Sequence, residues 1–452
     1  MQRKSFNKRV FIIIIILSLA VMPMQSHAAT MRQSVARAVQ NHPNVQASWH
    51  SFKAAQYEQE ASRGGYHPRI DIVGSVGYDS LGGQGYDSKE QTSYSWNGAY
   101  LTLNQMIYDG GLTPNQVKKF GFAKNARYYD LLDAIEKTAF LAFRAHDDVI
   151  RYNEMIRLAN ENLERHKEVL KLVEERYRAG VESAVNLDIA KGRLALANVN
   201  LLTEESNKHD AATQYYRAVG AMADQDMEEY TLEMKNPVAN DAAVEEWIGM
   251  SPRRNSVYQS VLSTFHAFEE QKGRLRPRID LRAGANLEND TDGVVGRKDK
   301  AFVELTLRYS IYNGSDRHTV RRFEQLYKQS EEILEKTDRE VAQSVRIACN
   351  DIQSIEQQLK HLFQRQESAG LMEKAYRQQY ELGRRSLLDL LDAQNEYFQA
   401  RRAYVNNLFS LNNAKANFLA ETGRLVSYFN ITREDVPAEE ALGIEKKTAG
   451  GG

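Results

Sequence analysis

The sequence predicts an α+β fold in which short alternating strands precede very long helices, and this pattern occurs twice in 452 residues. Three observations support the prediction. Landmark residues recur at a spacing of about 200 residues, which indicates a duplicated module. Two segments in each copy alternate between apolar and polar residues, as half-buried strands do. Proline is absent between Pro114 and Pro237 and between Pro277 and Pro437, which favours very long helices.

Composition excludes several classes of protein. Lys and Arg total 59 against 60 for Asp and Glu, so no basic surface for nucleic acid is expected. Charged residues make up 26% of the chain, which excludes a polytopic helical membrane protein. Cys349 is the single cysteine, and therefore neither an intramolecular disulfide framework nor a Cys-rich zinc site can form.

The first 28 residues have the pattern of a signal peptide. Basic residues precede an apolar run from Val10 to Met22, and Ser26 and Ala28 fit the small-residue positions of a cleavage site. The run is too short for a membrane span of roughly 20 residues, although a short N-terminal anchor is the alternative. No cysteine follows the run, so we do not expect a diacylated N-terminus.

The duplication is visible in paired motifs. Residues 67–71 (His-Pro-Arg-Ile-Asp) match residues 276–280 (Arg-Pro-Arg-Ile-Asp), at an offset of 209. The run Tyr177-x-x-Gly180-x-x-Ser183 matches Tyr380-x-x-Gly383-x-x-Ser386, at an offset of 203. We therefore expect a first copy at 29–220 and a second at 251–426.

Each copy is expected to contain two strands. In the second copy, residues 279–288 and 303–312 place apolar residues at odd positions, and residues 70–78 and 99–107 alternate more loosely in the first copy. The pattern fits a soluble antiparallel sheet with one solvent-exposed face, and it also fits transmembrane barrel strands. Four strands are too few to close a pore, so a barrel would need several chains.

Two long helices should follow each strand pair. Thr113 and Pro114 are expected to be the N-cap and first residue of a helix that continues to Tyr177, about 95 Å at 1.5 Å per residue. A helix of similar length is expected at 315–380. After each glycine turn, apolar residues follow a coiled-coil spacing that includes alanines where helices can approach closely: Ala190, Ala197, Ala211, Ala393, Ala400 and Ala414.

No catalytic constellation is present in the sequence, so we expect no enzyme, cofactor or metal site. A phosphate loop, a nucleophile elbow and a helical His-Glu-x-x-His are all missing. The second turn is more informative, because Gly383 can reverse the chain and Ser386 can cap the returning helix. Asp389 and Asp392 share one face of that helix. They can equally be solvated acids at a helix start.

The export signal, the duplicated strand–helix module and the Tyr-x-x-Gly turns resemble the TolC family of outer membrane efflux and secretion channels. The resemblance implies an α+β membrane protein that forms a homotrimer in the cell outer membrane, in contact with its lipids. Four strands per chain would build one shared transmembrane β-barrel, continued by a periplasmic α-helical coiled-coil barrel. Residues 221–250 resemble the equatorial linker of the family, and 427–452 resemble its equatorial or variable tail.

The resemblance also assigns residues at the periplasmic gate. Asp389 and Asp392 match the acidic positions of the constriction. Tyr380 and Arg385 match the latch positions, whose usual partners are an Asp and a Thr. This chain has Asn186 and Val185 there, so a Tyr380–Asn186 hydrogen bond remains available, whereas Val185 can offer Arg385 only a carbonyl group.

The two inter-helix turns match the grooves where adaptors dock in the family. The matching residues are Gly180 and Ser183 in the first copy, and Gly383 and Ser386 in the second. The implied partner is a periplasmic membrane-fusion adaptor.

Two functions follow from the resemblance, and a third possibility is the alternative if the resemblance does not extend to function. The first is a passive channel for type I secretion, with an inner-membrane ABC transporter and a secreted protein cargo. The second is small-molecule or multidrug efflux with a proton-driven pump, and the third is a non-channel periplasmic coiled-coil protein. Residues 41–45, 63–68 and 160–163 are most similar to channel subunits that export large adhesins.

Overall fold

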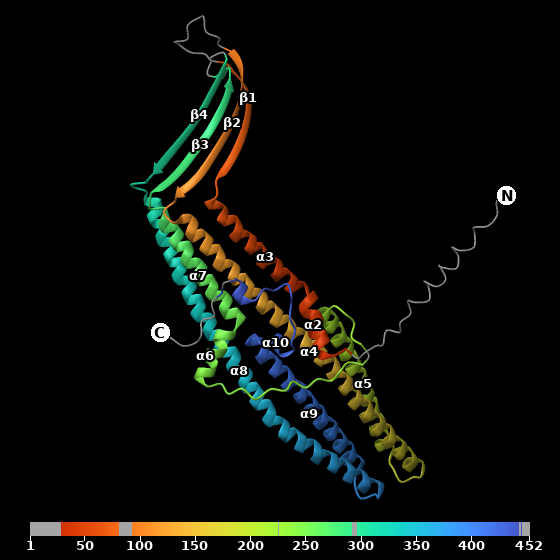
Figure 1. Ribbon diagram of the computed structural model, residues 1–452. Helices are drawn as coiled ribbons and strands as arrows, with labels where there is room; N and C mark the ends of the chain where they lie inside the picture. Colours follow the sequence, from red (N-terminus) through yellow and green to blue (C-terminus); the bar gives the residue numbers. More distant parts are fainter. Residues whose placement is uncertain (1–28, 81–92, 225, 292–295, 443, 445–452) are drawn as a thin grey trace, which may run out of the picture.

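The computed structural model describes residues 29–80, 93–224, 226–291, 296–442 and 444. The signal peptide expected at 1–28 and the end of the tail expected at 427–452 lie outside them. The molecule is elongated, with a four-stranded sheet at one end and the turns of two helical hairpins at the other (Figure 1).

The first half contains two short helices, a strand pair and two long helices: α2 (Met31–Asn41), α3 (Pro43–Arg63), a 3₁₀ turn η1 (Gly64–Tyr66), β1 (Arg69–Ser80), β2 (Ser93–Tyr108), α4 (Leu112–Arg178) and α5 (Ala184–Val219). The second half repeats this order and adds a short tail: α6 (Asp241–Met250), α7 (Pro252–Gly273), β3 (Arg278–Asn289), β4 (Arg297–Arg308), α8 (Gly314–Glu381), α9 (Leu387–Glu421), α10 (Leu425–Tyr428) and a 3₁₀ turn η3 (Glu439–Leu442).

The two halves correspond element by element. The long helices α4 and α8 have 67 and 68 residues, and the returning helices α5 and α9 have 36 and 35. The short helices α2 and α6 have 11 and 10 residues. Helix α6, which lies within the expected linker at 221–250, thus matches α2 in length and in its place before a longer helix.

The sheet is antiparallel, in the order β1-β2-β3-β4. Because side chains alternate along a strand, it has two chemically different faces. One face is aliphatic and exposed, with Ile72 paired to Leu101 and Leu281 paired to Leu305. The opposite face is polar and includes Arg282 paired to Glu304. Within the described residues, β1 and β4 are each paired on one side only.

Strand β4 differs from the expected segment at 303–312. It begins six residues earlier, at Arg297, and ends at Arg308 because its partner β3 begins at Arg278, which pairs with Arg308. Residues 309–312 therefore alternate in sequence but lie beyond the ladder. Arg297 and Asp299 are charged residues on the side of the strand that is aliphatic from Ala301 onward, which explains why alternation missed its first half.

The start of α4 also corrects the sequence prediction. Thr113 is not the N-cap, because the helix begins at Leu112 after Gly111. Buried Asp109 caps the helix instead: its carboxylate accepts hydrogen bonds from the backbone N–H groups of Thr113 (2.7 Å) and Gly111 (3.1 Å). The adjacent carboxylate also suits the positive end of the helix dipole.

The returning helices pack through small residues, as the coiled-coil spacing predicted. Five of the predicted alanines are almost fully buried, and Ala414 is partly buried against the main core: Ala190, Ala197, Ala211, Ala393 and Ala400. Cys349 is buried in the same core, where it packs as a small apolar residue.

Candidate functional site

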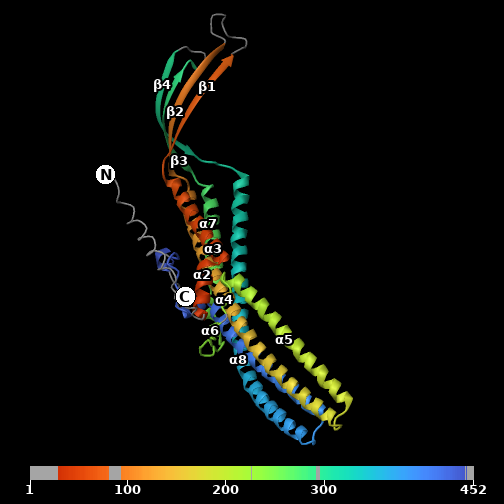
Figure 2. The same cartoon turned by 90° about the vertical axis from the view of Figure 1, so that its right-hand side faces the viewer.

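The ends of the two helical hairpins contain most of the predicted site residues (Figure 2). Each hairpin reverses at a glycine in the left-handed region, with φ of 73° at Gly180 and 70° at Gly383. Ser183 and Ser386 then cap the returning helices by accepting hydrogen bonds at 3.1 Å from backbone N–H groups three residues later. The local turn chemistry expected from the sequence is therefore present in both copies.

Glu182 joins the two turns. The hydroxyl of Tyr380, at the end of α8, donates to Glu182 Oε2 at 2.9 Å. The amide of Asn186 donates to Glu182 Oε1 at 2.5 Å. Arg176, near the end of α4, lies 3.7 Å from Glu182, donates to the carbonyl oxygen of Tyr380 at 3.1 Å and stacks over the Tyr380 ring. One carboxylate thus links both hairpins.

The protonation states in this cluster strengthen the link. Burial alone would raise the pKa of Glu182, but hydrogen bonds from Asn186 and Tyr380 and the charge of Arg176 hold it below its ordinary value. Burial, and next the bond to Glu182, raises the pKa of Tyr380. At neutral pH a protonated phenol therefore donates to an ionised carboxylate, which is a strong type of hydrogen bond.

This geometry differs from the latch contacts expected from the sequence, which were a Tyr380–Asn186 hydrogen bond and a contact of Arg385 with the Val185 carbonyl group. Tyr380 does not bond Asn186 directly, because Glu182 accepts from both side chains. Val185 is exposed. Arg385 instead stacks on the Tyr376 ring, 4.1 Å from its centroid, and lies 3.8 Å from Asp389.

Asp389 and Asp392 each lie beside an arginine. Arg385 lies in the turn four residues before Asp389, and Arg193 of α5 donates to Asp392 at 3.1 Å. Both carboxylates remain partly open to solvent, with 44% and 69% of their side-chain surface exposed. Each of the two acids is therefore paired with a base within the chain.

Sequence reasoning missed Glu182, Arg176 and Arg193. It compared only the positions that carry the usual latch partners, and Glu182 lies four residues before Asn186. The available signal was the charge of Glu182 and Arg176 close to the turn glycine Gly180.

Ion pairs continue above the turns, along the boundary between the two halves. Arg165 and Glu168 of α4 pair with Glu373 and Arg377 of α8, at 3.4 and 2.8 Å. Two further pairs attach α9 to the first half: Arg401 to Glu161 and Arg402 to Glu204. The boundary between the hairpins thus combines these ion pairs with an apolar cluster that includes Leu158 of α4 and Phe398 of α9.

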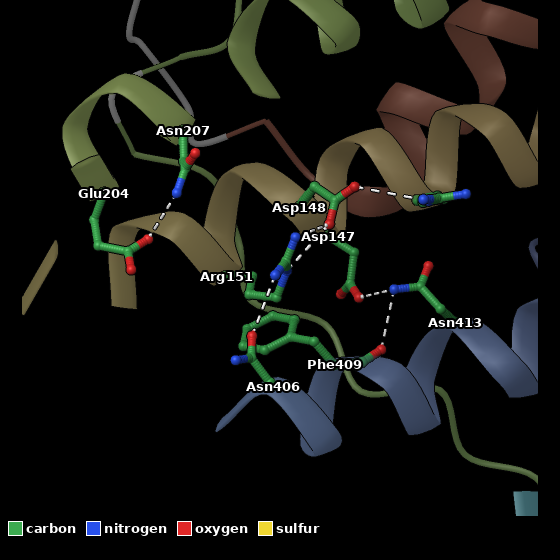
Figure 3. A network of polar contacts seen from close by, with 9 residues as sticks. Asp147, Asp148, Arg151, Glu204, Asn207, Asn406, Phe409 and Asn413 are labelled. Carbon is green, nitrogen blue, oxygen red and sulfur yellow. Dashed lines mark hydrogen bonds and ion pairs between the residues drawn. The ribbon is translucent and has the colours of Figure 1, made fainter. Parts of the chain in front are cut away.

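A buried polar cluster fixes the middle of the molecule, as Figure 3 shows in part. Asp147 of α4 is almost fully buried and accepts hydrogen bonds from Asn412 (2.9 Å) and Asn413 (3.0 Å) of α9. Asn412 also donates to the Tyr230 carbonyl oxygen and accepts from the Leu232 N–H. Burial raises the pKa of Asp147 to about 7.

Two more buried groups of α4 hold the chain segments around this cluster. His146 contacts the hydroxyl of Ser34 and the carbonyl oxygen of Glu228, at 2.9 and 3.0 Å. Glu136 accepts from the backbone N–H of Leu425 at 3.0 Å, and burial raises the pKa of Glu136 to about 8. We call Glu136, His146 and Asp147 the waist cluster; it ties α4 to α2, α9, the linker and the tail.

Within the described residues, His, Cys, Asp and Glu side chains do not gather in groups of three or more that could hold a metal ion. No helix in the part of the chain described by the structure is long and apolar enough to cross a membrane.

A family model described as outer membrane efflux protein matches residues 35–221 and 260–424, one block in each half. The chain belongs to this family. It is therefore an outer membrane protein, and its family and fold are those of a channel, as the resemblance implied.

Individual relatives have low sequence identity to this chain, but the alignments cover most of both proteins. Outer membrane efflux protein BepC of Brucella suis is 21% identical over 401 residues, which cover 88% of this chain and 86% of that protein. Outer membrane protein TolC of Escherichia coli is 24% identical over 440 residues, covering 91% and 84%. The solved CmeC outer membrane channel of Campylobacter jejuni has a TM-score of 0.79 at 15% identity, covering 87% and 85%. The structural match confirms the predicted TolC-like fold.

Proposed function

We propose that three copies of this chain form a passive duct that crosses the outer membrane and continues into the periplasm. The observation that supports this most is the sheet, which has one aliphatic face, one polar face and, within the described residues, two edges that pair with no further strand. Twelve strands from three chains would close the edges and place the aliphatic face toward lipid and the polar face toward water.

The helical turns at the far end form the gate in this proposal. Tyr380, Glu182 and Arg176 hold the two hairpins of one chain together, with Asn186 orienting Glu182. Asp389 and Asp392 line the constriction, and Arg385 belongs to the same set of contacts.

A periplasmic membrane-fusion adaptor is the proposed partner at the turns, where Gly180, Ser183, Gly383 and Ser386 form the docking surface. The two turn glycines have open space where a side chain would stand, so the turns present backbone to a partner.

For cargo, we propose protein export in a type I secretion system, with an inner-membrane ABC transporter supplying the energy. The duct itself needs no nucleotide or cofactor. This rests on the adhesin-exporter resemblance at 41–45, 63–68 and 160–163. Small-molecule efflux with a proton-driven pump is the second candidate, favoured because the Brucella suis relative carries the name of an efflux protein.

A deletion strain with a complemented control separates these functions. Proteins in the medium and on the cell surface are compared by mass spectrometry, and sensitivity to dyes, detergents and antibiotics is measured in parallel. Loss of one large exported protein with unchanged sensitivity supports type I secretion. Hypersensitivity with an intact set of exported proteins contradicts it and supports efflux.

A further inference from the structure

Aromatic rings on the polar face of the sheet lie directly over glycines of the neighbouring strand. Trp96 of β2 pairs with Gly77 of β1, and a Cβ atom added to Gly77 would lie 2.4 Å from the Trp96 ring. Phe302 of β4 pairs with Gly284 of β3, where an added Cβ would lie 2.8 Å from the ring. Non-bonded carbon atoms prefer 3.5–4.0 Å, so each ring occupies the space that a side chain would need.

Burial of the Trp96 indole nitrogen and cations beside Phe302 are consistent with rings that lie flat on the sheet. The indole Nε1 of Trp96 is buried, since the ring is pressed against the sheet. Phe302 has a cation on each side: the Arg282 guanidinium lies 5.4 Å from the ring centroid and the Lys300 ammonium 5.6 Å. Cation–π attraction at these distances favours the flat ring over one that stands away from the sheet.

We propose that the pairs Gly77–Trp96 and Gly284–Phe302 set the bore of the duct inside the membrane. This rests on the proposed function, in which the polar face lines the lumen. Twelve strands spaced 4.8 Å apart and tilted by about 40° give a backbone diameter of roughly 24 Å. Rings that lie flat leave most of this width open, whereas three copies of a ring standing upright would narrow it from three sides.

Gly77 is the better position for a test. The three atoms nearest to an added Cβ there all belong to the Trp96 ring, whereas at Gly284 one of the three is the carbonyl oxygen of Leu101, at 2.9 Å, whose displacement would disturb the sheet. Gly74 provides a matched control on the same strand: it belongs to the aliphatic face and has no atom within 4 Å of an added Cβ. We therefore expect Gly77→Val to lift the ring and Gly74→Val to leave it in place.

The bore can be measured from outside the cell, without opening the periplasmic gate. Asn104→Cys places a thiol on the polar face eight residues beyond Trp96, toward the helices. Cys349 is buried and should not react. Intact cells are treated with maleimides that carry polyethylene glycol chains of graded length, and the largest reagent that labels the thiol is recorded.

With Gly77→Val, we expect the size limit to move to shorter reagents while the smallest maleimide still reacts. Gly74→Val should leave the limit unchanged, and Gly77→Val with Trp96→Ala should restore it. An unchanged limit in Gly77→Val would overturn the inference about the bore. If the smallest maleimide fails to label Asn104→Cys in the otherwise native chain, the proposal that the chain forms an open duct is wrong.

The position of the ring has a separate readout, which also serves if Gly77→Val assembles poorly. In a background with Trp49→Phe and Trp247→Phe, Trp96 is the single tryptophan. The milder Gly77→Ala already adds the clashing Cβ, so acrylamide should quench Trp96 fluorescence more strongly than in the background protein or with Gly74→Ala. Equal quenching in all three proteins would show that the ring does not depend on Gly77.

Discussion

Replacing Tyr380 with phenylalanine tests the proposed gate with the smallest change. The variant removes one hydroxyl and keeps the ring that stacks with Arg176. Glu182 keeps its contacts with Asn186 and Arg176, so its carboxylate is not left without partners. The change therefore affects mainly the bond that joins the two hairpins.

The expected effect on the gate is large because the proposed trimer has three copies of the bond. A hydrogen bond to a charged group contributes about 1.5–3 kcal/mol net. At the lower limit, three bonds favour the closed state by about 4.5 kcal/mol, and each 1.4 kcal/mol is a factor of ten in the equilibrium. Tyr380→Phe should thus raise the ratio of open to closed channels by roughly a thousandfold.

Single-channel recording in planar lipid bilayers measures this ratio. Tyr177→Phe is the matched control, because Tyr177 is the counterpart of Tyr380 in the first copy and is exposed. Tyr380→Phe should show long high-conductance openings that wild type and Tyr177→Phe lack. In combination, Glu182→Gln and Tyr380→Phe should open the channel less than the sum of their separate effects. Wild-type conductance in Tyr380→Phe would refute the latch.

Three further predictions concern the constriction, the waist cluster and the helix seam. Arg193→Ala should free Asp392 and raise the cation-to-anion permeability ratio, measured as a reversal potential; an unchanged ratio would remove Asp392 from the conduction path. The folded-state pKa of Glu136, about 8, lies above its ordinary value of 4.5, so between these values the fold keeps a proton that the unfolded chain releases, and stability falls as pH rises. Glu136→Gln has no ionisable group at this position, so the difference in melting temperature between the variant and wild type should grow in favour of the variant by a few degrees from pH 5 to pH 9. A difference that stays constant with pH would contradict the raised pKa of Glu136. Ala400→Leu should overpack the seam and cost about 1–3 kcal/mol, seen as a lower melting temperature; an unchanged value would mean that the seam is loose there.

The fold could be predicted from the sequence because its signals are local. Alternation in strands and alanine spacing in helices depend on neighbouring residues, and the duplication gave each signal twice. Prediction failed where a distant part of the chain decides the outcome. Strand β4 ends at Arg308 because β3 begins at Arg278, and Asp109 rather than Thr113 caps α4.

The site shows the same division. Gly383 and Ser386 were predictable, since a turn and a cap involve residues a few positions apart. The bond between Glu182 and Tyr380 joins residues 198 positions apart and depends on how the hairpins are placed. The family pattern also pointed to Asn186, and the acceptor lies four residues earlier.

The free edges of β1 and β4 have a genetic consequence. Within hydrocarbon, each unpaired backbone group costs several kcal/mol. A chain that cannot pair through both sheet edges would therefore prevent closure of the barrel in any of the proposed trimers that contain it. In a cell that makes equal amounts of wild-type chain and a chain unable to pair through β4, only about one trimer in eight would consist of three wild-type chains. Such an allele should be dominant, although it destroys a function rather than creating one.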